Sequence, residues 1–314
     1  MYKFLKFKEG FTLENEKTIN ELINEWLNYK KVILKESSYY RYIYMINQYI
    51  LPYLNNIKML NIVSYDFNNL VAELMKTLKA TSIKNVIGLL KSILSYAYKK
   101  YGYEYNFNFV SLPKIHKTEL RVLTQREKNR LEKYCLKNNS LRDIGIVICL
   151  NTGLRIGEIC ALKWNCINLD KRVIKVQYTM QRIYDKIEKK SKISIDVPKS
   201  ENSLRTIPIS TKLYSILKPL KKQYKSNCYF LTGSSNNYIE PRNYQNYFKK
   251  CVKVCKIKDF HFHQLRHSFS TECINVGMDI KSLSEILGHS DIKITLQKYV
   301  HSSFSTKKKY LERL

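Results

Sequence analysis

His263-Gln264-Leu265-Arg266-His267 is the stretch on which the fold assignment of this chain rests. It places an arginine between two histidines, and the chain continues from it to Leu287-Gly288-His289 and to Tyr299. Cationic and hydrogen-bonding side chains of these types are suited to binding a phosphate group. A single His, Arg or Tyr in a basic protein is more often a surface or packing residue. The interpretation therefore depends on residues that lie upstream.

The net charge indicates a polyanionic partner. The 314-residue chain has 55 Lys and Arg against 26 Asp and Glu, a formal net charge of +29. An excess of this size favours nucleic acid as the partner. A membrane is disfavoured, because the chain has no apolar run of about 20 residues and lysines interrupt its first 16 residues. We expect a cytoplasmic protein with no membrane partner.

The cysteines and histidines allow a zinc interpretation, which we consider the weaker one. The eight cysteines are scattered through apolar segments, where reduced Cys acts as a small apolar residue. Cys251, Cys255, His261 and His263 form a C-x3-C-x5-H-x-H pattern that superficially offers four zinc ligands. Zinc fingers usually separate the two pairs by about a dozen residues. We therefore predict no metal and no cofactor.

Apolar side chains at helical spacing predict a helical domain over residues 17–102. Thr18 and Glu21 have the spacing of a capping box, and an amphipathic helix follows them. Further helices are predicted from Ser37 or Ser38 to Pro52, over Tyr65–Leu78, and after Thr81. Four short helices of this kind form a small bundle. Residues 1–16 are interpreted as an N-terminal extension, too short for an additional DNA-binding domain.

The helical periodicity disappears over residues 103–122, which we interpret as a linker to a second domain over residues 123–314. Thr124 and Glu127 repeat the capping-box spacing at the start of its first helix. Later helices are predicted over Leu141–Leu150, Leu213–Tyr224 and Pro241–Cys255, the first of them apolar enough to be buried on all sides.

Three segments of this second domain predict short antiparallel strands: 173–176, 193–197 and 205–209. A polar turn that contains Lys199 joins the last two of them. The expected fold class is therefore mainly α with a small antiparallel β-sheet.

Asn151-Thr152-Gly153-Leu154-Arg155-Ile156-Gly157-Glu158 contains a local conflict. Gly153 is expected to end one helix, which places Arg155 in the first turn of the next, where the helix dipole disfavours a cation. Pairing of Arg155 with Glu158 would explain the arginine structurally, and phosphate binding would explain it functionally. The motif alone does not decide between the two.

Six side chains suited to phosphate chemistry follow one another in the second domain: Arg155, Lys199, His263, Arg266, His289 and Tyr299. Their order resembles the tyrosine recombinase family, also called the phage integrase family. The matching motifs are Thr-Gly-Leu-Arg-x-Gly-Glu, a lysine on a strand turn, His-x-Leu-Arg-His, Leu-Gly-His and a terminal tyrosine. The resemblance covers nearly the whole chain. It implies an N-terminal SAM-like core-binding domain, which binds DNA, and a C-terminal catalytic domain.

The resemblance implies that the hydroxyl of Tyr299 attacks a DNA phosphate directly and forms a 3′-phosphotyrosyl intermediate without metal. Arg155 and Arg266 would hold the non-bridging oxygens, because a guanidinium binds bidentately and stays charged. His263 matches the group that takes the tyrosine proton, since a histidine titrates near neutral pH.

Three further roles are implied by the family match. His289 would donate a hydrogen bond to the phosphate, and Lys199 would protonate the departing 5′ oxygen. Glu158 would orient Arg155 without contacting the phosphate itself. His267 is interpreted as a residue that supports the fold.

The expected partners are double-stranded DNA recombination sites and a homo-tetramer assembled on two paired sites, with an accessory directionality factor as a further candidate. The long strand region over residues 181–196 favours integration or excision of a mobile element. Two alternatives stay open: a Xer-like resolvase of chromosome or plasmid dimers, and a catalytically silent DNA-binding relative. Type IB topoisomerases use similar chemistry without pairing two sites.

Overall fold

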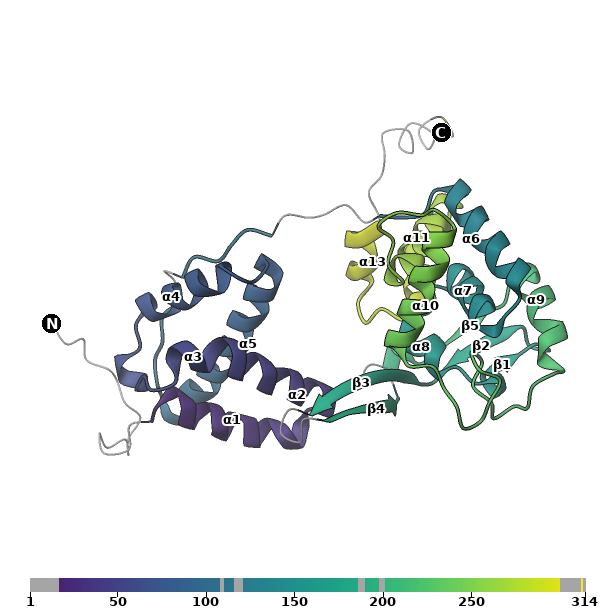
Figure 1. Cartoon of the computed structure of the whole chain (residues 1–314). Helices are drawn as coiled ribbons and strands as arrows, with labels where there is room; N and C mark the ends of the chain where they lie inside the picture. The colour runs from purple at the N-terminus through teal and green to yellow at the C-terminus, as the bar shows by residue number, and fades with distance from the viewer. Residues whose placement is uncertain are drawn as a thin grey trace. The chain divides into compact units, whose positions relative to one another are not determined.

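The computed structural model describes residues 17–107, 110–115, 121–185, 190–197, 201–299 and 312, and the chain divides into two compact units (Figure 1). Unit 1 comprises residues 1–118 with 183–192, and unit 2 comprises residues 119–182 with 193–314. The extension 1–16, Lys199 and almost all of the tail after Tyr299 lie outside the described residues. The domain limits expected from the sequence stay predictions.

Unit 1 is a helical bundle around one apolar core. Its first helix, α1 (Ile19–Ile33), begins at the predicted capping box: the Thr18 hydroxyl accepts from the backbone N–H of Glu21, whose carboxylate accepts from the N–H of Thr18 at 2.8 Å. The elements that follow are α2 (Glu36–Met45), a π-helical turn (Ile46–Ile50), α3 (Leu51–Leu54), a 3₁₀ turn (Met59–Asn61), α4 (Ser64–Met75) and α5 (Ala80–Tyr101).

The limits predicted for the second helix are wrong at both ends. The helix begins at Glu36, so neither Ser37 nor Ser38 is its cap, and helical structure continues past Pro52 to the end of α3. Pro52 is accommodated because the π-helical turn interrupts the regular hydrogen-bond pattern before it. It then stands in the first turn of α3, where a missing N–H has little effect.

The segment after α5 packs on the core of unit 1, although the sequence assigns it to a linker. Gly102 ends α5 with a φ of 78°, a left-handed conformation that glycine adopts without strain. Tyr103 is buried in the core. The ring of Phe107 stacks on Phe67 with a centroid distance of 4.3 Å. The chain is therefore held against unit 1 for several residues beyond its last helix.

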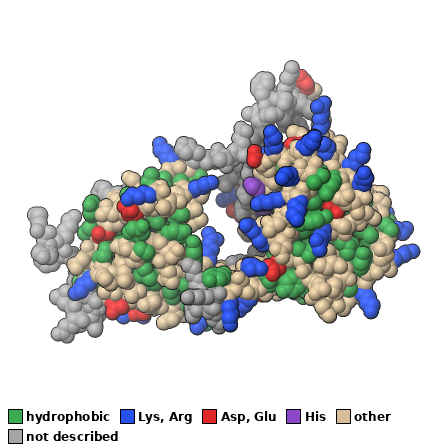
Figure 2. Space-filling model, viewed as in Figure 1, with side chains coloured by type: hydrophobic (Ala, Val, Ile, Leu, Met, Phe, Trp, Pro, Cys, Tyr) green, Lys and Arg blue, Asp and Glu red, His purple; other side chains and the backbone are tan. Residues whose placement is uncertain are grey.

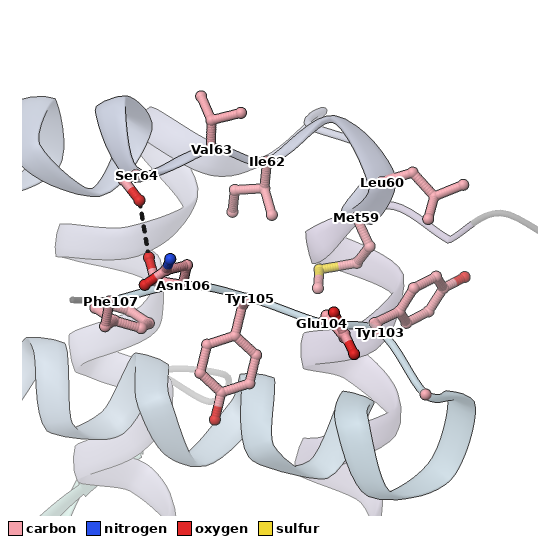
Figure 3. A pocket seen from close by; sticks show the side chains of 11 residues that line it. Met59, Leu60, Ile62, Val63, Ser64, Tyr103, Glu104, Tyr105, Asn106 and Phe107 are labelled. Carbon is pink, nitrogen blue, oxygen red and sulfur yellow. Dashed lines mark hydrogen bonds between the residues drawn. The ribbon is translucent and has the colours of Figure 1, made fainter. Parts of the chain in front are cut away.

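An open cavity of about 640 Å³ lies between residues 59–64 and 102–107 of unit 1 (Figure 3). Met59 and Tyr105 are among its lining side chains, and the Ser64 hydroxyl links the two segments by donating to the carbonyl of Asn106 at 3.0 Å. The predicted site residues all belong to unit 2, and none of them lines this cavity.

Unit 2 is built on a larger apolar core. Its first helix, α6 (Gln125–Asn138), begins at the predicted capping box of Thr124 and Glu127. α7 (Leu141–Thr152) is buried along most of its length, as its apolar sequence predicts. The later helices are α8 (Ile156–Ala161), α9 (Thr211–Lys221), α10 (Pro241–Val254), α11 (His263–Asn275), α12 (Ile280–Leu287) and α13 (Ile292–Tyr299).

The strands within the described residues form two separate sheets. In the three-stranded sheet, β2 (Val173–Val176) pairs antiparallel with β1 (Ile167–Asn168) and with β5 (Arg205–Pro208). β3 (Thr179–Asp185) and β4 (Lys190–Asp196) form a two-stranded sheet. The three predicted strands are confirmed, and the last two lie in different sheets, β4 beside β3 and β5 beside β2. Alternation of apolar and polar residues predicts that a segment is a strand, but it does not identify the strand that pairs with it. β2 and β5 bury apolar side chains in the core, whereas β4 has no buried residue.

The described surface is rich in basic side chains. Lys and Arg, blue in Figure 2, are distributed over the visible face of each unit, with Asp and Glu sparse among them. This distribution accords with the formal net charge of +29. In the part of the chain that the structure describes, no helix has the length and apolar character needed to cross a membrane.

Candidate active site

Arg155 precedes α8 as its N-cap residue, one position earlier than the sequence suggests. Gly153 ends α7 with a φ of 66°, and the Glu158 carboxylate then accepts two hydrogen bonds of 2.8 Å from Arg155, one from its backbone N–H and one from Nη1. The expected conflict with the helix dipole is relieved, because the anionic Glu158 occupies the first turn and neutralises the cation beside it. The predicted pairing of Arg155 with Glu158 is confirmed.

Glu158 is also bound by Arg205, a residue that no sequence motif indicates. Arg205 lies on β5 and donates from Nη1 to Oε1 and from Nη2 to Oε2, both at 2.8 Å. The side chains are 2% and 5% exposed for Glu158 and Arg205. Burial raises the pKa of Glu158, but the hydrogen bonds and charge of Arg205 and the charge of Arg155 outweigh this effect and lower the pKa to about 2. Glu158 is therefore held ionised.

Arg266 connects two distant turns of unit 2. It lies on α11, is only 2% exposed, and donates from Nη1 to the carbonyl of Gly153 at 2.9 Å and from Nη2 to the carbonyl of Leu287 at 2.6 Å. Burying a guanidinium costs free energy unless its N–H groups have hydrogen-bond acceptors. Both turns supply such an acceptor to Arg266. The two predicted arginines therefore share one turn, the one between α7 and α8.

The end of α12 is a common acceptor for three arginines. Its last carbonyls lack partners within the helix and have partial negative charge. Three successive residues accept one bond each: Ile286 from Arg205 Nε at 2.6 Å, Leu287 from Arg266 at 2.6 Å, and Gly288 from Arg155 Nη2 at 2.9 Å. β5, α11 and the N-cap of α8 thus meet at one point.

His289 follows this point directly. Gly288 ends α12 with a φ of 64°, and the backbone N–H of His289 donates to the carbonyl of Ser284 at 3.1 Å. The ring is half-buried, and its Nδ1 lies 2.8 Å from the hydroxyl of Thr295, a fully buried residue of α13. Tyr299 is the last residue of the same helix. The bond from His289 to Thr295 therefore links the end of α12 to the helix that contains Tyr299.

The structure describes the remaining predicted residues only in part. His263 is the first residue of α11, with an exposed side chain whose ring lies 4.7 Å from that of His267 in an edge-on arrangement. Arg155, Arg266 and His289 are brought together by the end of α12. Lys199 lies outside the described residues, and the side chain of Tyr299 is not among those described. The roles of all six residues stay predictions.

The cysteines of the zinc interpretation belong to the core. Burial raises the pKa of Cys251 to about 12 and also raises the pKa of Cys255, which disfavours the thiolate that a metal needs. The Sγ of Cys251 lies 3.8 Å from a carboxylate oxygen of the buried Asp143. Among the described residues, no group of three or more His, Cys, Asp or Glu is arranged to hold a metal ion.

Acid unfolding of unit 2 is expected to depend on Glu158. Its folded pKa of about 2 lies below the value of about 4.3 in an unfolded chain, so the ionised carboxylate stabilises the fold above that value. This contribution, on the order of 3 kcal/mol, is lost as the pH falls towards the folded pKa.

The measurement is the free energy of unfolding as a function of pH, from urea titrations of the wild type and Glu158→Gln. The variant should lose stability less steeply in this acid range, because every other carboxylate is common to both proteins. Parallel curves would contradict the assignment.

Residues 121–306 match the sequence profile of the Phage integrase family, and residues 18–75 match that of the phage integrase N-terminal SAM-like domain. The chain is 29% identical to a tyrosine recombinase XerC-like protein of Caldanaerobacter subterraneus, over 59% of this chain and 51% of the relative. It is 27% identical to a tyrosine recombinase of Agathobacter rectalis, over 80% of this chain and 81% of the relative.

A third relative, the transposase of transposon Tn916 from Enterococcus faecalis, is 27% identical over 62% of this chain and 51% of its own length. The chain spans about half the length of the XerC-like and Tn916 proteins.

Two solved structures share the fold. The Tn1549 transposon integrase in complex with transposon right end DNA has a TM-score of 0.76 at 23% identity, covering 95% of this chain and 99% of the other. The lambda integrase tetramer bound to a Holliday junction has a TM-score of 0.63 at 18% identity, covering 91% and 78%. The predicted fold class is confirmed: a mainly helical chain with small antiparallel sheets, a SAM-like N-terminal domain and an integrase-type C-terminal domain.

Proposed function

This chain belongs to the phage integrase family of tyrosine recombinases, and from that premise we propose that it is a site-specific DNA recombinase with Tyr299 as its nucleophile. The observation that carries the proposal is that Arg155 and Arg266 both bind carbonyls at the end of α12, and that His289 directly follows this end. Three groups suited to a phosphate are thereby held in one place by rigid elements, which is what phosphoryl transfer requires.

In the proposed reaction, the hydroxyl oxygen of Tyr299 attacks the phosphorus and the bond from phosphorus to the 5′ oxygen breaks. The tyrosine proton passes to His263, and Lys199 protonates the departing 5′ oxygen. A proton acceptor is needed because a free tyrosine has a pKa near 10. Arg155 and Arg266 stabilise the charge that develops on the non-bridging oxygens. Attack by a 5′-hydroxyl on the phosphotyrosine reverses the sequence and rejoins the strand.

The proposed substrate is duplex DNA, bound by a homo-tetramer on two paired sites. The net charge of +29 supports it, as does the likeness to integrase structures that contain DNA, including a tetramer on a Holliday junction. Neutralising many phosphates releases counterions, so DNA affinity should fall steeply as salt increases. An accessory directionality factor and a cytoplasmic location belong to the same proposal.

Integration and excision of a mobile element is the physiological role that we propose. Similarity to the Tn916 transposase and to the Tn1549 integrase supports it. The XerC-like relative supports a second candidate, resolution of chromosome or plasmid dimers. The two roles differ in substrate: recombination of a circular-junction sequence from DNA flanking the gene indicates the first, and recombination of a repeated chromosomal site indicates the second.

A nicked suicide duplex built from the flanking junction sequences tests the proposed chemistry. After cleavage the short 5′-hydroxyl fragment diffuses away, so the covalent protein–DNA adduct accumulates. Protease digestion and mass spectrometry should place the nucleotide on the peptide that contains Tyr299, attached through a 3′-phosphate. Attachment to a 5′-phosphate or to another residue would contradict the proposal, and DNA binding without an adduct would favour a silent DNA-binding relative.

Thr295→Val is expected to lower the cleavage rate by roughly 10-fold, while Thr295→Ser should stay close to wild type. The Thr295 hydroxyl lies 2.8 Å from Nδ1 of His289, and we propose that it is the donor of this bond. The proton of the neutral imidazole is then on Nε2, where His289 can donate it to the phosphate. Valine preserves the shape but removes that donor. Nitrogen-15 NMR of the His289 ring should show a mixture of tautomers in the valine variant. An unchanged tautomer would contradict the role of Thr295.

A further inference from the structure

Arg205 has no place in the reaction proposed above, yet it makes four hydrogen bonds at the site, to Glu158, Ser203 and Ile286. We infer that Arg205 is a positioning residue that orients Arg155 through Glu158 and through the end of α12. This inference rests on the proposed function. It concerns a residue with no role in the proposed reaction, whose Nη atoms both bind Glu158 and whose Nε binds the carbonyl of Ile286.

The first argument is the way in which Glu158 is shared. Its Oε1 accepts from Nη1 of Arg205 and from Nη1 of Arg155, each at 2.8 Å. Its Oε2 accepts from Nη2 of Arg205 and from the backbone N–H of Arg155, again each at 2.8 Å. Each carboxylate oxygen therefore binds one donor from each arginine. Because the fork of Arg205 sets the plane of the carboxylate, it also sets the direction from which Arg155 must approach.

The second argument is the contact between Arg205 and the turn that precedes His289. A Cβ atom on Gly288 would lie 2.9 Å from Cδ of Arg205 and 2.8 Å from the carbonyl oxygen of Asn202. The start of β5 thus packs closely against Gly288, the residue whose carbonyl binds Arg155. The amide of Asn202 also lies 3.4 Å from the carbonyl of His289. Arg205 therefore fixes both acceptors of the Arg155 guanidinium, Glu158 and Gly288.

The third argument is energetic. A buried ion pair is weak evidence for stability, because the loss of hydration of two charges offsets most of their attraction. A well-packed apolar pair would hold β5 against α8 equally well. The bidentate geometry matters for a different reason: it keeps Glu158 ionised and oriented next to Arg155, with a pKa lowered to about 2. A lysine at this position would preserve the charge but could not supply the two parallel bonds.

Single-turnover cleavage of the nicked suicide duplex tests the inference, with DNA affinity measured separately by fluorescence anisotropy on an uncleaved duplex. We expect Arg205→Ala to slow cleavage by roughly 10- to 100-fold and Arg205→Lys by less, with the Kd for DNA changed by no more than about 3-fold. A merely structural role would instead lower cleavage and DNA binding together with the fraction of folded protein. Cleavage by Arg205→Ala at the wild-type rate would overturn the inference.

Arg121→Ala is the matched control. Arg121 donates from Nη2 to Glu127 at 2.8 Å, and Glu127 belongs to the capping box at the start of α6, as Glu158 does at the start of α8. Removing Arg121 should lower the melting temperature without changing the cleavage rate. If Arg121→Ala slows cleavage as much as Arg205→Ala does, general destabilisation explains both results and the inference fails.

A double variant separates action through Arg155 from independent action. Because Arg205 is inferred to act through Arg155, Arg155→Ala/Arg205→Ala should cleave no more than about 3-fold slower than Arg155→Ala alone. A further loss equal to that of the single Arg205 variant would show that the two residues act independently. Such a result would overturn the inference.

A crystal structure of Arg205→Lys gives a readout that does not depend on activity. The distance of 2.9 Å between Arg155 Nη2 and the carbonyl of Gly288 should be lost in that variant. If the wild type forms no adduct with the suicide duplex, the proposed function fails, and the crystal structure still decides whether Arg205 positions Arg155. An unmoved Arg155 would overturn the inference even in an active recombinase.

Discussion

Tyr299→Phe is expected to abolish the covalent protein–DNA adduct, lowering its rate of formation by at least about 10⁴-fold. Phenylalanine preserves the ring at the end of α13 but has no hydroxyl oxygen to attack the phosphate. Nothing else in the proposed phosphate site changes, so the Kd for duplex DNA should stay within about 2-fold of wild type. The measurement combines adduct formation on the suicide duplex with anisotropy on an uncleaved duplex.

Tyr238→Phe is the control for this substitution. Tyr238 is an exposed tyrosine of unit 2 that contacts the ring of Tyr229, away from the end of α12 in sequence, and it has no role in the proposed reaction. Its variant should form the adduct at the wild-type rate. An adduct that persists in Tyr299→Phe would assign the nucleophile to another residue and remove the basis of the proposed mechanism.

Arg266→Ala is expected to destabilise unit 2 by about 3–5 kcal/mol as well as to abolish cleavage. The guanidinium is 2% exposed and is the donor to the carbonyls of Gly153 and Leu287. Its removal leaves two buried acceptors without these bonds and a cavity between α11 and the end of α12. The free energy of unfolding from urea titration measures the loss, and a change under about 1 kcal/mol would contradict the structural part of the prediction.

Arg155→Ala provides the contrast. Its side chain is 34% exposed, so water can hydrate the groups that it leaves, and Arg205 still binds both oxygens of Glu158. We expect cleavage to slow by about 10³-fold, to a residual rate that single-turnover experiments still measure, with a loss of stability under about 1.5 kcal/mol. Equal losses of stability in the two variants would show that burial does not distinguish these arginines.

Much of the fold could be predicted because its signals are local. The capping boxes at Thr18 and Thr124 predict the starts of α1 and α6, since the bonds that define a helix end join residues three positions apart. The apolar run of α7 predicts a buried helix for the same reason. The predicted helix end at Pro52 is wrong, because the periodicity of apolar residues does not indicate the π-helical turn that precedes this proline.

Part of the candidate site could also be predicted from the sequence. The order of Arg155, His263, Arg266, His289 and Tyr299 is a property of the chain alone, and all five lie within residues 121–306, which match the family profile. Arg205 is the first residue of the predicted strand 205–209, and no sequence motif indicates a role for it. A charged residue in a strand expected to be partly buried needs a partner, and that need was the available signal.

The amino-acid sequence by itself therefore determined the starts of α1 and α6, the two kinds of domain and the set of residues suited to phosphate chemistry. Only the tertiary structure decided that β4 pairs with β3 and that Arg205, 47 residues from Glu158, binds its carboxylate. It also decided that three arginines meet at the end of α12. The physical reason is that periodicity and capping report contacts within a few residues, whereas partners of strands and buried charges are selected by burial across the whole folded unit.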